Sequence, residues 1–92
     1  MAIDENLLGK ARNSPHDLRF EEALKLAKQL GFVEVRSTGS HRIFHHPAGG
    51  KIPSPPRPLN LQEGKNGRAK AYQVRQMLTM AEAMGIIRRD GE

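Results

Sequence analysis

The chain has 92 residues, no cysteine and a formal net charge of +5 at pH 7. This length supports one domain with one core and leaves no room for a deep cavity, so we expect no small-molecule cofactor. The lack of cysteine excludes disulfides, thiolate metal sites and a cysteine nucleophile. No apolar run approaches the roughly 18–20 residues of a membrane span, and no secretory signal is recognisable, so we expect a cytoplasmic protein without a membrane partner.

The positive charge is concentrated in the middle of the chain. Residues 36–75 contain eight Lys or Arg and one acid, whereas the remaining positions contain seven bases and nine acids. Such a cluster is typical of proteins that bind a polyanion, of which nucleic acid is the commonest. A solvated basic surface without a ligand is the alternative.

Two helices are predicted in the first third of the chain. A short one covers residues 4–12, and the sequence Asn13-Ser14-Pro15 ends it. The second covers residues 20–30, where apolar residues follow helical spacing, with acids in the first turn and lysines later. Gly31 is the expected C-cap. The apolar stripe of this second helix is predicted to consist of Phe20, Ala23, Leu24, Ala27 and Leu30.

Three short strands are predicted in the middle. Residues 32–37 and 41–46 are rich in β-branched and aromatic side chains, and the short turn between them indicates an antiparallel hairpin. Four prolines within residues 48–58 make that stretch an extended loop. Residues 59–62 alternate between apolar and polar side chains and form the expected third strand.

A Gly- and Lys-rich connection precedes the last helix, expected at residues 70–84, and a polar tail covers 88–92. The fold class is therefore α+β: a three-stranded antiparallel sheet with two long helices on one face, plus the short N-terminal helix. The other face of the sheet stays open to water. We expect residues 1–17 to be an extension and 18–87 the domain. The α–β–β–β–α order is that of double-stranded-RNA-binding domains, although a fold alone does not give a function.

Three of the four histidines lie in the second predicted strand. Side chains alternate along a strand, so His41 and His45 share a face and His46 points away. Four steps of ~3.3 Å separate His41 from His45 by about 13 Å, whereas zinc ligands each lie ~2 Å from the metal. We therefore expect no metal site built from these residues.

One histidine could instead act as a general acid or base. RNA carries its own nucleophile, the 2′-hydroxyl, and a base that removes its proton lets the oxygen attack the adjacent phosphorus. Such cleavage also needs positive groups for the developing charge and a proton donor for the leaving oxygen. His41 follows a Gly-Ser turn, with Arg42 beside it and Arg36 across the hairpin. The alternative is a polar surface strand without chemistry.

Several short motifs together resemble the signature of HicA toxins from bacterial toxin–antitoxin modules. They are Gly39-Ser40-His41, Ile43-Phe44, His46-Pro47, the preceding Leu30-Gly31-Phe32 with Arg36, and the helical stretch 72–78. The similarity covers residues 18–85. This chain adds residues 1–17, and its third strand lacks the Val-Pro-x-His ending of many members.

The resemblance implies a fold of the double-stranded-RNA-binding type and ribosome-independent cleavage of messenger RNA without a metal. It implies that His41 is the catalytic residue and that a HicB-type antitoxin covers the site. It also implies a bacterial or archaeal cytoplasmic protein.

The predicted function is a metal-independent endoribonuclease toxin in which His41 acts as general base or as an acid/base in relay. Gly39 permits a tight turn beside the RNA backbone, Ser40 bonds a phosphate, and His45 is the candidate second proton carrier. The predicted RNA-binding residues are Arg36, Gly39, Ser40, Arg42, His45, Lys65, Arg68 and Lys70. The alternatives are a non-catalytic RNA-binding module and a protein-interaction domain.

Overall fold

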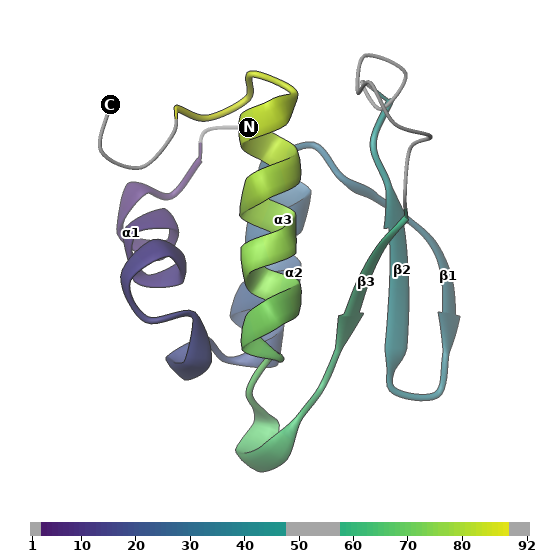
Figure 1. Ribbon diagram of the computed structural model, residues 1–92. Coiled ribbons are helices and arrows are strands. Elements are labelled where there is room, and N and C mark those ends of the chain that lie inside the picture. The colour runs from purple at the N-terminus through teal and green to yellow at the C-terminus, as the bar shows by residue number, and fades with distance from the viewer. Residues whose placement is uncertain (1–2, 48–57, 89–92) are drawn as a thin grey trace.

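The computed structural model describes residues 3–47 and 58–88. Its elements in chain order are α1 (Glu5–Asn13), η1 (Pro15–Asp17), α2 (Phe20–Gln29), β1 (Val33–Thr38), β2 (His41–His45), β3 (Leu59–Gln62), η3 (Lys65–Gly67) and α3 (Ala71–Ala83). The predicted α+β class is confirmed, with the α–β–β–β–α order and the additional N-terminal helix (Figure 1). The predicted proline-rich loop and polar tail lie outside the described residues, except at Pro58 and Arg88.

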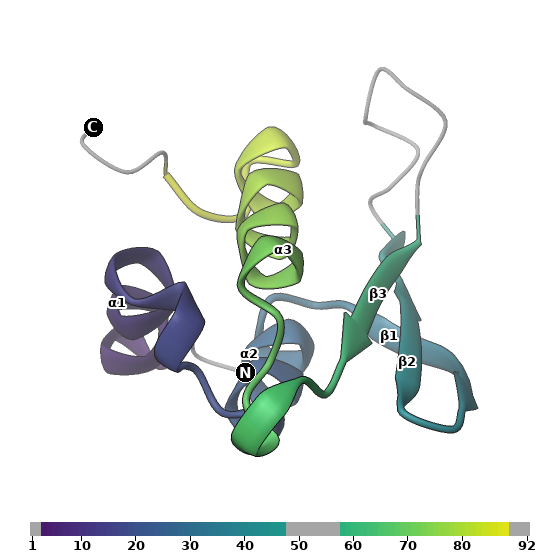
Figure 2. The same ribbon diagram turned by 60° about the horizontal axis from the view of Figure 1, so that its bottom comes forward.

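The three strands form one antiparallel sheet in the order β1-β2-β3. Both α2 and α3 cover the same face of this sheet, and α1 lies on the far side of these two helices (Figures 1 and 2). None of the described helices lies on the opposite face of the sheet in either view. The layered arrangement therefore matches the one expected from two amphipathic helices and a half-buried sheet.

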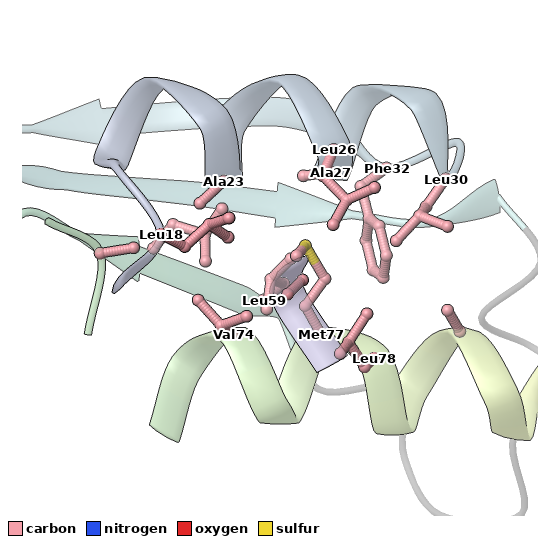
Figure 3. Close-up of a cluster of buried hydrophobic side chains, with 14 of the residues drawn as sticks. Leu18, Ala23, Leu26, Ala27, Leu30, Phe32, Leu59, Val74, Met77 and Leu78 are labelled. Carbon is pink, nitrogen blue, oxygen red and sulfur yellow. The ribbon is translucent and has the colours of Figure 1, made fainter. Parts of the chain in front are cut away.

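The core lies between the helix-covered face of the sheet and the two long helices (Figure 3). Phe44 of β2 and Leu59 of β3, which are paired across the sheet, are fully buried. The stripe of α2 differs from the predicted one: Leu26 is fully buried, whereas Phe20 and Leu24 pack only at the margin of the core. The buried face of α2 consists of Ala23, Leu26 and Ala27, and its C-cap residue Leu30 continues it.

Helix α1 belongs to the same core, although it precedes the long helices. The side chain of Asp4 caps it by accepting a hydrogen bond from the backbone N–H of Leu7 at 3.1 Å. Leu7, Leu8 and Ala11 turn inward and are buried with the residues of α2 and α3. A helix this short is marginal alone in water, so its packing against the long helices stabilises it.

The segments that lead into α2 and α3 are hydrogen-bonded to each other. Ala69 N–H donates to the carbonyl oxygen of Leu18 at 2.9 Å, and Arg19 and Arg68 form an antiparallel bridge. Both long helices consequently start at the same end of the molecule and run in the same direction. The β1–β2 hairpin turns at that end as well (Figures 1 and 2).

Gln73 is a buried polar residue in α3, only 2% exposed. Its side-chain oxygen accepts a hydrogen bond from the backbone N–H of Gln62 at 2.7 Å, and its Nε2 donates to the hydroxyl of Tyr72 at 3.3 Å. The amide thereby satisfies a backbone donor at the end of β3 and fixes α3 against that strand. The apolar pattern of the helix gave no sign of this role.

Candidate functional site

His41 is the first residue of β2 and lies on the open face of the sheet. Its pairing partners are Thr38 of β1 and Gln62 of β3. Because Arg42 and Phe44 face the helices, alternation places His41 and His45 on the opposite face. The His41 ring is half-buried, and its Nδ1 accepts a hydrogen bond from Asn60 Nδ2 at 3.3 Å.

The strand register shows which other side chains share the face of His41. Arg36 of β1 pairs with Ile43, so it lies on the same face, two pairs along from the histidine. His45 lies on this face at the far end of β2, where it pairs with Val33. We call this set the open face; its residues are Val33, Arg36, Thr38, His41, Ile43, His45, Asn60 and Gln62.

The predicted turn residues Gly39 and Ser40 join β1 to β2 directly before His41. Gly39 has φ +57°, in the left-handed region that favours glycine. A Cβ atom placed there would meet nothing within 4 Å, so the requirement at this position is conformational. Ser40 is exposed beside it. The turn thus leaves the backbone next to His41 accessible from solvent.

A second group of predicted residues gathers around η3. Lys65, Arg68 and Lys70 line a pocket of about 310 Å³ together with His16 of η1. The first residue of α3, Ala71, also lines it, so the positive end of the α3 dipole adds to the local potential. Arg68 lies 3.4 Å from the exposed carboxylate of Asp17. We call this the basic pocket. Most of its lining residues belong to the segment 64–71, which lies at the end of the molecule where the β1–β2 hairpin turns (Figures 1 and 2).

A family model described as "HicA toxin of bacterial toxin-antitoxin" matches residues 20–83. The chain belongs to the HicA toxin family. The match spans α2, the whole sheet, η3 and α3, and leaves out α1 and η1. No curated protein and no solved structure matches the chain significantly. The protein is therefore a HicA toxin of a toxin–antitoxin system, and a cognate antitoxin is implied.

The other histidine of the HicA-like motif, His46, has a structural role. Its Nε2 donates to the carbonyl oxygen of Leu30 at 2.9 Å, and its ring packs edge-on against Phe32 with centroids 4.9 Å apart. Gly31, with φ +95°, passes directly beneath: a Cβ there would lie 2.8 Å from His46 Nε2. His46 therefore joins the end of α2 to the end of β2, and Gly31 is needed for both its backbone conformation and this close approach.

Arg42 does not share the face of its neighbour His41. It pairs with Leu61 and turns toward the helix side, where its Nε and Nη2 donate to the two carboxylate oxygens of Glu34, the second at 2.7 Å. The hydrogen bond from Arg42 lowers the pKa of Glu34, and the same bond raises the pKa of Arg42. The structure thus brings Arg36 and His45 to the face of His41 and holds Arg42 in an ion pair behind it.

Acid should lower the folding stability of this toxin in part through protonation of Glu34. A carboxyl whose folded pKa lies below its ordinary value of 4.5 contributes stability above that pH and loses it as the pH falls through the folded value. Below about pH 4.5, we expect the free energy of unfolding of Glu34→Gln to fall less steeply with decreasing pH than that of the wild type. At pH 7 the variant should be less stable than the wild type by under about 1 kcal/mol. Urea denaturation at a series of pH values measures both.

The stability of Glu34→Gln should still depend on pH in acid. Hydrogen bonding to the backbone N–H of Arg19, and then to Lys10, also lowers the pKa of Glu22. The ion pair is irrelevant to acid stability if wild type and Glu34→Gln show the same curve.

The described residues contain no group of three His, Asp or Glu side chains that could hold a metal ion. Within the same residues, no helix is long and apolar enough to cross a membrane.

Proposed function

We propose that this HicA toxin is an endoribonuclease that cleaves messenger RNA with His41 as its proton-transferring residue. The observation that carries the proposal is the position of His41. Its half-buried ring lies on a sheet face that none of the described helices covers, with Arg36 on the same face and the basic pocket at the same end of the molecule. An extended polyanion could contact the histidine and the cations together.

In the proposed reaction, His41 removes the proton from a ribose 2′-hydroxyl. The 2′-oxygen then bonds to the adjacent phosphorus, and the bond from phosphorus to the 5′-oxygen of the next nucleotide breaks. The products are a 2′,3′-cyclic phosphate and a free 5′-hydroxyl, whose proton comes from an acid. His45, on the same face as His41 but about 13 Å along the strand, is the candidate acid and would donate to the leaving oxygen through an intervening water.

The cations have two tasks in this scheme. Arg36 would stabilise the charge that develops on the phosphorane oxygens. The three cations of the basic pocket would hold phosphates further along the strand. Ser40 would donate to a phosphate oxygen, and the open turn at Gly39 would let the RNA backbone approach. Arg42 faces the helix side and is paired with Glu34, so it takes no part in the contact of RNA with the open face.

The experiment is an incubation of the purified chain with a labelled single-stranded RNA. We expect fragments ending in 2′,3′-cyclic phosphate, formed equally well in excess chelator, and no cleavage of the same sequence made with 2′-deoxyribose. Intact RNA after long incubation, bound in a salt-sensitive way, would favour the alternative of a non-catalytic RNA-binding module. Cleavage of the deoxy strand would exclude the 2′-hydroxyl as nucleophile.

RNA affinity should depend on the basic pocket. The logarithm of the RNA-binding constant falls linearly with the logarithm of the salt concentration. Each cation that binds a phosphate of a single strand contributes ~0.7 to the magnitude of this slope, so Lys65→Ala/Arg68→Ala should reduce the magnitude by about 1.4. The matched control is Lys25→Ala/Lys28→Ala, which removes the same charge from exposed positions of α2. Fluorescence anisotropy on an uncleavable deoxy strand measures the slopes. Equal slopes in the two double variants would mean that only net charge matters.

The antitoxin completes the proposed function. We propose that a HicB-type antitoxin binds over the open face at His41 and so blocks access of RNA. The exposed valines Val33 and Val35 of the outer strand β1, 52% and 55% exposed, offer apolar contact area at the margin of this face.

A further inference from the structure

The ring of His41 has one hydrogen-bond partner among the described residues, the side-chain amide of Asn60. Asn60 pairs with Ile43, two positions along from His41, so its amide reaches the histidine diagonally across β2 and β3. Asn60 Nδ2 donates to His41 Nδ1 at 3.3 Å. The amide oxygen, Oδ1, is buried and has no hydrogen-bond partner in the described part of the chain.

This orientation of the amide has a chemical consequence. When Nδ1 accepts a hydrogen bond, the proton of the neutral ring is on Nε2. A ring in that state can donate from Nε2 but cannot take up a proton there. A general base that uses Nε2 needs the other neutral tautomer, in which Nδ1 carries the hydrogen and Nε2 carries the lone pair.

A half-turn of the amide about its last torsion angle exchanges its nitrogen and oxygen with almost no change of shape. Oδ1 then accepts from Nδ1–H, while Nδ2 takes the buried position that Oδ1 held, so the pair keeps one hydrogen bond in either orientation. The same orientation also fits the charged ring, because an imidazolium carries hydrogen on both nitrogens. The amide need not move again when His41 takes up a proton.

We propose that Asn60 is the positioning residue of His41: its Oδ1 accepts from Nδ1–H and leaves the Nε2 lone pair toward the RNA. This inference rests on the proposed function for its purpose, but not for its test. The register supports the assignment. On the open face, β1 contributes Arg36 and β2 contributes His45, whereas the neighbouring residues of β3 are the uncharged Asn60 and Gln62. No carboxylate of the described strands lies on this face, so the amide oxygen is the acceptor available to Nδ1–H.

The tautomer can be measured without RNA. Long-range ¹H–¹⁵N correlation spectra of the full-length chain, recorded at a pH where the ring is neutral, distinguish a protonated from an unprotonated ring nitrogen. We expect Nδ1–H in the wild type and a change to Nε2–H, the form that free histidine favours, in Asn60→Ala. Gln62→Ala is the matched control, since Gln62 also lies beside His41 on β3 but its side chain makes no hydrogen bond to the ring. This control should keep the wild-type tautomer.

Kinetics provide the second measurement. Asn60→Ala should lower kcat on the order of ten- to hundredfold with KM changed by less than about twofold, because RNA binding does not need the amide. Asn60→Asp keeps an oxygen acceptor for Nδ1–H and should recover much of the loss. Its acid limb in the pH–rate profile should move to higher pH, because a carboxylate favours the imidazolium.

The two proposals fail in different ways. Nε2–H in both the wild type and Asn60→Ala overturns the role of Asn60, even if His41 is essential for cleavage. A tautomer change as expected, in a chain that never cleaves RNA, leaves the assignment of Asn60 intact and removes the proposed function. A wild type with Nε2–H also decides against Asn60 if Asn60→Ala does not fold.

Discussion

His41→Ala is expected to remove RNA cleavage by this HicA toxin and to leave its fold and its RNA affinity almost unchanged. A positioned acid or base contributes about 10²- to 10⁴-fold to a rate, so the residual rate should be lower by at least about a hundredfold. The half-buried ring at the start of β2 contributes little to the core, and the cations of the basic pocket remain. Cleavage rates, thermal unfolding and anisotropy on a deoxy strand give the three readouts.

The matched control for this variant is Thr38→Ala. Thr38 pairs with His41 across the hairpin and is exposed, so its replacement disturbs the same part of the sheet without touching the ring nitrogens. We expect this variant to cleave RNA at nearly the wild-type rate and to arrest growth when induced without antitoxin. His41→Ala should be harmless under the same induction. A His41→Ala protein that cleaves RNA at the wild-type rate would contradict the proposal that His41 transfers the proton.

Phe44→Ala should have the largest effect on stability. Phe44 is fully buried between the sheet and the helices, and truncating a buried phenylalanine costs about 3–5 kcal/mol. A small domain has about 5–15 kcal/mol in total, so the variant should be close to unfolding at 37 °C. Urea denaturation at 25 °C measures the loss, as a lower midpoint with an unchanged slope.

Ile43→Ala is the comparison for Phe44→Ala, because it shortens the adjacent side chain of β2 on the open face, where burial is only partial. We expect it to cost clearly less than Phe44→Ala. Similar losses for the two variants would mean that the open face is covered in the folded protein. That outcome would also weaken the proposal that RNA reaches His41 from this side.

Local patterns were sufficient to predict the α-helices and the strands. The apolar spacing of residues 20–30 and the short turn at Gly39 depend on neighbours in the chain, so α2 and the β1–β2 hairpin were predictable to within a residue of their observed bounds. The short η1 and η3 helices were not predicted, because a three-residue 3₁₀ turn has no apolar period to detect. The partial burial of Phe20 depends on how α2 is rotated against its neighbours, which its own sequence does not determine.

The site was predictable only where it depends on the hairpin. Alternation along β2 correctly gave the shared face of His41 and His45. Asn60 was missed because its position beside His41 depends on the pairing of β2 with β3, and the long connection between these strands leaves their register open. The same limit applies to His16, which joins Lys65 in the basic pocket only through the docking of two distant segments.

The parallel course of α2 and α3 has a consequence for how fast a ligand arrives. Helix dipoles that point the same way add their fields, whereas an antiparallel pair would largely cancel them. The end where both helices begin therefore has dipole fields of one sign beside the basic pocket, whose cations attract anions over about a Debye length, roughly 8–10 Å in physiological salt. A polyanion would accordingly be steered toward the hairpin end before any specific contact forms, which favours a high association rate at low ionic strength.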